Sequence, residues 1–181
     1  IEEREFHRSV LGAFAGDATA NGRHTEASEF YRTLFEWDHQ PDDLCSASRS
    51  LAAADKKDEA LKLITENEGR LAGQPEWACK KMLLLAGIGK PADSLQVAVK
   101  LLKSGTLAAS MAAVYLETLI EGRSFSEAQS FVKLLTEIDT SAVWHLYNAL
   151  LMAETGGRSK AAAVVRAVRT AAPDDLELAV E

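Results

Sequence analysis

Residues 142–168 read AVWHLYNALLMAETGGRSKAAAVVRAV, and this stretch decides the fold. After Gly156-Gly157, a small residue and three apolar residues stand at intervals of three, four and seven positions: Ala161, Val164, Val165 and Val168. This spacing is one apolar face of a helix. Ala149 and Met152 supply apolar positions before the glycines, and glycine ends a helix at little steric cost. The stretch therefore predicts two helices joined by a tight turn.

The same pattern recurs along the chain in an almost constant frame. The small residues that open it are Ala27, Ala60, Ser94, Ala128 and Ala161, separated by 33, 34, 34 and 33 positions. Helices are predicted in pairs at 5–20 and 25–37, 42–54 and 56–71, 76–87 and 91–104, 107–121 and 125–137, and 140–155 and 159–171. A last helix is predicted to begin near Asp174.

Turn signals stand between the two helices of each pair. They are Asn21-Gly22, Asp55, Gly87 through Pro91, Gly122 and Gly156-Gly157. Ser124 and Glu127 have the spacing of a capping box at the start of a helix. Each pair buries one face against its mate and another against the next pair, so the sequence predicts an all-α stacked array.

The period of 34, the helix pairs and the small residue opening each second helix resemble the tetratricopeptide repeat family. The fifth unit matches best, through Trp144, Tyr147-Asn148-Ala149, Gly156, Ala161 and Pro173. The resemblance implies a right-handed α-α superhelix of about five hairpins, forming a single domain over residues 1–181. Its units would span 8–41, 42–74, 75–108, 109–141 and 142–174, with 174–181 as a cap or the start of a further helix.

Some residues depart from the family pattern. Lys81 and Asn148 stand where an apolar residue is usual, and the prolines that end each unit come late or are missing. Sel1-like and pentatricopeptide arrays are alternative helical-hairpin families. The net charge of −7 disfavours the pentatricopeptide alternative, because those proteins are usually basic and hold RNA.

Composition narrows the classes of function. Of the 181 residues, 47% are hydrophobic, which argues against a disordered chain. The net negative charge opposes binding to nucleic acid or anionic membranes. The longest apolar run, Met82 to Gly89, is too short for membrane insertion. The two cysteines slightly favour a reducing compartment such as the cytoplasm, and a periplasm or organelle stays open.

Candidate chemical groups are few, and we predict neither an enzyme nor a cofactor. The four histidines and two cysteines lack the spacing of metal ligands. Cys45 and Cys79 occupy equivalent places in neighbouring units, and we expect two free, partly buried thiols. Gly87, Gly89 and Lys90 follow a helix rather than the strand that a phosphate loop requires. Trp77 and Trp144 are predicted to pack between repeats.

The resemblance also implies a concave wall lined by the first helices, along which partners lie. The candidate partner-binding residues on this wall are Cys45, Arg49, Ala53, Cys79, Leu83, Glu117, Glu121, Leu146 and Leu150. The lysine and asparagine clamp with which some family members hold chaperone tails is not present. We therefore expect a non-catalytic scaffold that binds a peptide or helix with apolar anchors.

Two alternatives remain open. The chain is read either as a docking or regulatory region of a larger enzyme or envelope or secretion assembly protein, or as an array that self-associates through its ends. The first alternative is suggested by a start at Ile1 rather than methionine. The second is suggested by Phe6, Val10, Leu11 and Phe14, which give the first helix an apolar side that faces outward.

Overall fold

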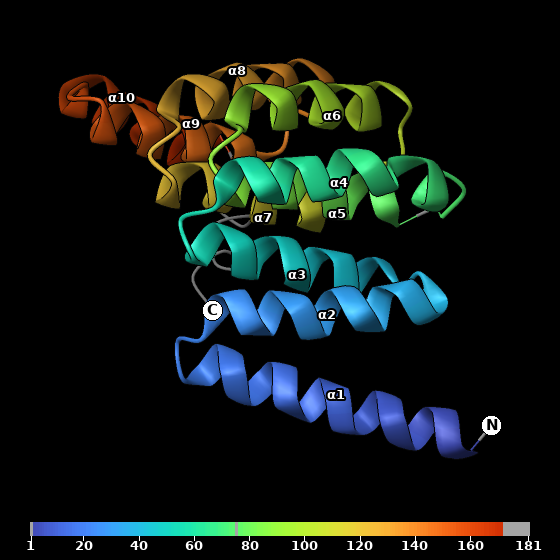
Figure 1. The fold of residues 1–181 in the computed structure, drawn as a ribbon. Coiled ribbons are helices and arrows are strands. Elements are labelled where there is room, and N and C mark those ends of the chain that lie inside the picture. The colour runs from blue at the N-terminus through green and yellow to red at the C-terminus, as the bar shows by residue number, and fades with distance from the viewer. Residues whose placement is uncertain (1, 75, 172–181) are drawn as a thin grey trace. The chain divides into compact units, whose positions relative to one another are not determined.

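The computed structural model describes residues 2–74 and 76–171, where all regular secondary structure is α-helical (Figure 1). The chain divides into two compact units, unit 1 over residues 1–104 and unit 2 over residues 105–181. The all-α prediction is confirmed. The helix predicted near Asp174 lies outside the described residues.

Unit 1 consists of three helical hairpins. Their helices are α1 (Glu2–Ala20), α2 (His24–Asp38), α3 (Pro41–Ala53), α4 (Lys57–Leu71), α5 (Trp77–Gly87) and α6 (Pro91–Lys103). Each hairpin packs its two helices together, α2 packs on α3, and α5 contacts both α3 and α4. The observed bounds lie within three residues of the predicted ones.

Unit 2 contains two further hairpins. Their helices are α7 (Ala109–Glu121), α8 (Phe125–Ile138), α9 (Ala142–Glu154) and α10 (Arg158–Ala171). Here α8 contacts both α7 and α9, while α10 packs on α9. In both units the second helix of one hairpin therefore packs on the first helix of the next.

The small residue that opens each predicted pattern is buried. Ala27, Ala60, Ser94 and Ala128 have 0% of their surface exposed, and Ala161 has 6%. A buried small side chain leaves room for two helix backbones to approach each other closely. The one serine in the set is satisfied, because Ser94 Oγ donates a hydrogen bond to the Met82 carbonyl at 2.7 Å.

The turn inside each hairpin has one backbone geometry. A single residue takes positive φ: Gly22 (71°), Asp55 (62°), Gly89 (83°), Arg123 (54°) and Gly156 (93°). The amide of the next residue donates to the carbonyl five residues back, at 2.7–2.9 Å in all five turns. This is the Schellman motif that ends a helix. The five left-handed residues repeat at 33, 34, 34 and 33 positions, as the small residues do.

In the fourth hairpin the predicted turn chemistry is wrong in two respects. Gly122 has φ −73°, and Arg123 takes the left-handed position instead. The Ser124 side chain makes no capping bond. Its amide donates to Leu119 O at 2.8 Å, which holds Ser124 at ψ 57° rather than in the extended conformation of a capping residue.

Two glycines near one turn should respond oppositely to substitution by alanine. Gly89→Ala should destabilise the chain by about 1 kcal/mol, because alanine strains a left-handed backbone. The added Cβ would meet only Lys57 Nζ at 3.6 Å, so backbone strain should account for the loss. Gly87→Ala, at the end of α5 with open space around its Cβ, should stabilise by about 0.5 kcal/mol. Urea unfolding measures both changes, and shifts of the same sign would contradict this assignment.

An ion-pair cluster joins the first three helices. Arg8 on α1 contacts Asp38 on α2 through Nη1 at 2.9 Å and Asp43 on α3 through Nη2 at 2.6 Å. Asp43 is buried, with 8% of its surface exposed. Burial raises the pKa of Asp43, and the hydrogen bond from Arg8 opposes that shift. Arg8 therefore favours the ionised form of a buried carboxyl group at the junction of two hairpins.

Removal of Arg8 should destabilise unit 1 in a pH-dependent way. Arg8→Met should cost about 1–2 kcal/mol at neutral pH, because Asp43 loses its cationic partner while Arg8 itself is partly solvated. The variant raises the pKa of Asp43 further, so its folded state binds a proton more readily than its unfolded state. The stability deficit should therefore shrink as the pH falls toward 4.

Chemical denaturation at several pH values checks this expectation. The double variant Arg8→Met, Asp43→Asn is the control, since it leaves no buried carboxylate to protonate. Its deficit relative to the parent protein should depend less on pH. An Arg8→Met deficit that grows on acidification would contradict the assignment.

Candidate functional site

In unit 1 the predicted wall residues lie on α3 and α5. Counted back from the left-handed residue of each turn, Cys45 and Cys79 are both at the tenth position, and Arg49 and Leu83 are both at the sixth. Because α3 packs on α5, these equivalent positions belong to one side of unit 1. Arg49 and Ala53 are exposed, while Cys79 and Leu83 are partly buried.

Cys45 differs from the other wall candidates of unit 1. It is 4% exposed and belongs to the core cluster of that unit. Burial raises its pKa to about 11, so the thiol is protonated and weakly nucleophilic at neutral pH. Both cysteines are free, as predicted. Cys45 is therefore a core residue of unit 1 and does not present its thiol at the surface.

In unit 2 the wall candidates lie on α7 and α9. Glu117 and Leu150 take the sixth position before the turn, Leu146 takes the tenth and Glu121 the second. Both glutamates are exposed, Leu146 is half-buried and Leu150 is 45% exposed. The side thus combines acidic and apolar side chains.

Sequence reasoning missed the residue that connects the two helices of this side. Tyr147 Oη donates a hydrogen bond to Glu117 Oε1 at 2.8 Å, from α9 to α7. The Tyr147 ring stacks on Trp144 with centroids 6.1 Å apart, and Trp144 Nε1 donates to Asp139 Oδ2 at 2.7 Å. This last bond is the main cause of the lowered pKa of Asp139. The sequence signal that could have identified Tyr147 was its position directly after Leu146, a predicted partner-binding residue.

Two more exposed apolar residues extend this side of unit 2. Val114 stands three positions before Glu117 on α7 and is 45% exposed. Val143 stands seven positions before Leu150 on α9 and is 37% exposed. Residues at these spacings share one side of a helix. Val114 therefore shares a side of α7 with Glu117, and Val143 and Leu150 share a side of α9 with Tyr147, so exposed apolar residues lie on the same sides as the two partners of this hydrogen bond.

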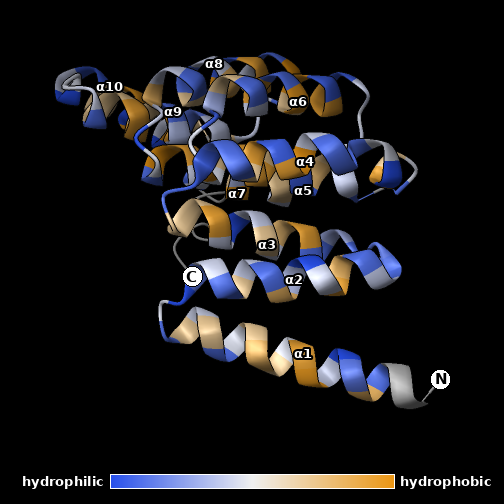
Figure 2. Cartoon of the chain, in the orientation of Figure 1, coloured by the Kyte–Doolittle hydropathy of each residue, from blue (hydrophilic) through white to orange (hydrophobic). Residues whose placement is uncertain are grey.

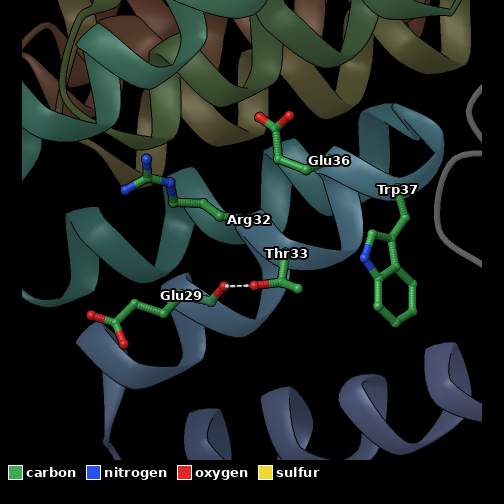
Figure 3. A pocket seen from close by; sticks show the side chains of 5 residues that line it. All are labelled: Glu29, Arg32, Thr33, Glu36 and Trp37. Atoms are coloured by element: carbon green, nitrogen blue, oxygen red, sulfur yellow. Dashed lines mark hydrogen bonds between the residues drawn. The ribbon is translucent and has the colours of Figure 1, made fainter.

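Surface hollows in unit 1 lie on other parts of the hairpins. A hollow of about 360 Å³ lies along α2 and is lined by Glu29, Arg32, Thr33, Glu36 and Trp37 (Figure 3). Arg70 on α4 holds Glu36 through two contacts of 3.0 Å. All five lining residues come from one helix, and the arrangement offers no convergent set of groups for chemistry.

Two further hollows lie between helices of unit 1. One of about 350 Å³ is lined by residues of α4, α5 and α6: Leu61, Ile64, Thr65, Lys81, Leu85, Asp93, Gln96, Val97 and Lys100. The other, of about 570 Å³, lies between the turns of the first two hairpins and is lined by Gly22, Arg23, His24, Thr25, Glu26, Ala53, Ala54 and Asp55. Ala53 is the wall candidate that reaches this second hollow.

The described residues offer neither a metal-binding cluster nor a membrane-spanning helix. In the part of the chain that the structure describes, no group of three or more histidine, cysteine, aspartate or glutamate side chains could hold a metal ion. Among the described helices, none has the length and apolar character needed to cross a membrane. Trp77 and Trp144 are 4% and 2% exposed, which confirms their packing role.

Five hairpins with equivalent turns and equivalent buried small residues define a tetratricopeptide-like helical repeat protein. No family model matches the sequence, and a search of curated proteins finds no similar sequence. Among solved structures, the chain is similar in fold to MamA, residues 41 to the end, from Desulfovibrio magneticus RS-1. The TM-score is 0.53 at 12% identity, over 90% of this chain and 93% of that one.

A MamA RS-1 double mutant, described as ArsTM, gives the same TM-score, identity and coverage. At this level of identity the likeness concerns the fold. It supports the tetratricopeptide-like helical repeat expected from the sequence.

The hydrogen bond between Tyr147 and Glu117 should be visible in the titration of the tyrosine. Burial and the bond to Glu117 raise the pKa of Tyr147 to about 12. Glu117→Gln removes the negative charge, so the pKa should fall toward, but not reach, the ordinary value of 10. Ultraviolet absorbance of tyrosinate measures the shift, with Tyr147→Phe identifying the signal among the three tyrosines. An unchanged pKa would show that Glu117 is not the partner in solution.

Proposed function

We propose that this chain is a non-catalytic scaffold that binds a protein segment with apolar anchors on the sides formed by its first helices. The observation that carries the proposal is the exposed apolar surface of Val114, Val143 and Leu150, on the same sides of α7 and α9 as Glu117 and Tyr147. Exposed apolar groups rimmed by polar ones are typical of protein-interaction surfaces.

The two units offer different chemistry to a partner. In unit 1 the proposed contacts are Arg49, Ala53, Cys79 and Leu83, supported by Cys45, and Arg49 suits an acidic side chain of the partner. In unit 2 they are Glu117, Glu121, Leu146 and Leu150, which suit a segment that carries both apolar and basic side chains. We assign the apolar anchors of the partner to Leu83 and Leu150.

The side chains support binding better than catalysis. The buried Cys45 thiol is protonated at neutral pH, and the carboxylate Glu117 is engaged by a tyrosine hydroxyl. Asp139 likewise accepts hydrogen bonds from Trp144 and from the Ser141 amide. These groups hold the helices in place, so the proposal includes neither a reaction nor a cofactor.

Selection from a displayed library of random peptides tests the proposal and requires no identified partner. Peptides retained by the parent chain should carry apolar residues. A peptide held by unit 1 should bind Leu83→Asp at least about tenfold more weakly, and a peptide held by unit 2 should bind Leu150→Asp at least about tenfold more weakly, since each change places a charge in an apolar contact. Titration by fluorescence anisotropy measures the affinities.

Matched controls distinguish a loss of binding at the proposed contact residues from a loss of binding caused by unfolding. Ile138→Asp changes another exposed apolar residue, 62% exposed at the end of α8, and Arg32→Glu reverses an exposed charge on α2. Both controls should bind as the parent does, and circular dichroism must show equal helicity. Peptides that bind all four variants as tightly as the parent would refute the assignment to the first-helix sides.

A further inference from the structure

Two exposed aromatic side chains lie on the outer side of α1, the side away from α3. Phe6 is 66% exposed and Phe14 is 53% exposed. The Phe14 ring stacks on Phe30 of α2, with centroids 5.9 Å apart and an interplanar angle of 28°. Figure 2 shows hydrophobic residues along the middle of α1. The stacking fixes Phe14 in an orientation that leaves half of its surface in water.

The equivalent positions on α3, the first helix of the second hairpin, show which kind of helix packs against such a surface. Phe14 stands eight positions before Gly22, the left-handed residue after α1, and the equivalent residue of α3 is Ala47. Val10 stands twelve positions before Gly22, and the equivalent residue of α3 is Asp43. Ala47 and Asp43 are 0% and 8% exposed. From the preceding hairpin α2 packs on α3, and Arg8 of α1 pairs with Asp43. The outer side of α1 is therefore equivalent to the side of α3 against which the second helix of another hairpin packs.

The second helix with complementary properties is α10. Its 14 residues include four cations and no acidic residue: Arg158, Lys160, Arg166 and Arg169. All four are exposed, and the ion pairs of the described residues involve none of them. Arg158, Ala162, Arg166 and Arg169 follow one another at spacings of four, four and three, which places them along one side of the helix.

Size and charge both favour contact between these two surfaces. Exposed alanines on α10, Ala162 among them, leave room for an aromatic ring from α1. Within the first hairpin, residues 5–38 carry six acidic and three basic side chains, a net charge of −3, whereas α10 carries +4. Asp17, three positions after Phe14, pairs with Arg23 of its own turn and still has a side chain that is 60% exposed.

We propose that a second copy of this chain docks head to tail, with α10 of one copy on the outer side of α1 of the next. The contact copies the packing of α2 on α3 in unit 1 and of α8 on α9 in unit 2. It joins two different surfaces, α10 of one copy and α1 of the next, so the contact is heterologous, and an assembly that does not close into a ring can add further copies. This proposal goes beyond the proposed function, because the contact involves none of the proposed partner-binding residues of either unit.

Sedimentation equilibrium of the whole chain tests the proposal. The parent should show a mass that rises with concentration between about 1 and 100 µM, the range expected of a modest interface. Phe14→Asp should weaken association more than about tenfold, and so should the double variant Arg158→Glu, Arg169→Glu. Phe6→Ser is the second probe of the α1 side if Phe14→Asp lowers the helix content. Added salt should weaken the parent assembly.

Mixing the two kinds of variant distinguishes a head-to-tail contact from any other. Phe14→Asp keeps an intact α10, and the Arg158→Glu, Arg169→Glu protein keeps an intact α1. An equal mixture should therefore form a species of two chains that neither forms alone, and nothing larger. Ile138→Asp and the pair Lys62→Glu, Lys133→Glu are controls with matched changes elsewhere, and they should associate as the parent does.

Three results would overturn the proposal. The first is a parent chain that stays monomeric over the whole concentration range. The second is association lost equally in the control variants, and the third is a mixture that fails to restore the two-chain species. A monomeric parent that still binds selected peptides would leave the proposed scaffold function intact.

Discussion

The close approach of two helices at one buried small residue is the constraint on which the rest of this structure depends. At Ala27, Ala60, Ser94, Ala128 and Ala161 a larger side chain would force the hairpin apart. Five residues before each of them, a left-handed residue turns the chain back at the distance that this contact requires. The left-handed turn and the helix contact at the small residue thus act together, and together they determine the geometry of each hairpin.

The consequences of this arrangement extend to the surfaces. Because the turn fixes the rotation of each first helix, positions ten, six and two residues before it always project on the same side. In unit 1 this places Arg49 and Leu83 in equivalent positions, and in unit 2 it does the same for Glu117 and Leu150. The repeat sets the positions, and the residues that occupy them give each unit its own chemistry.

Periodicity in the sequence was sufficient to predict the helices, the buried small residues and the packing role of Trp77 and Trp144, because these follow from local spacing. The left-handed Arg123 was missed because glycine stands one position earlier and has the stronger turn preference. The buried Asp43 depends on Arg8, 35 residues away, and the burial of Cys45 depends on packing between hairpins. Contacts between distant side chains leave no local pattern, so the Tyr147–Glu117 bond also required the three-dimensional structure.

The constant distance of five residues from left-handed turn to small residue has an evolutionary consequence. Because this interval never changes, the alternation of the period between 33 and 34 is absorbed between the small residue of one hairpin and the turn of the next. Within that stretch the connections between hairpins differ in length, from two residues between α2 and α3 to five between α4 and α5. Those connections, such as the segments between α4 and α5 or between α8 and α9, are where insertions and deletions can accumulate. A single residue added inside a hairpin turn would rotate a whole first helix by about 100° relative to its mate. The connections between hairpins can therefore change in length while the spacing of residues within each hairpin stays constant.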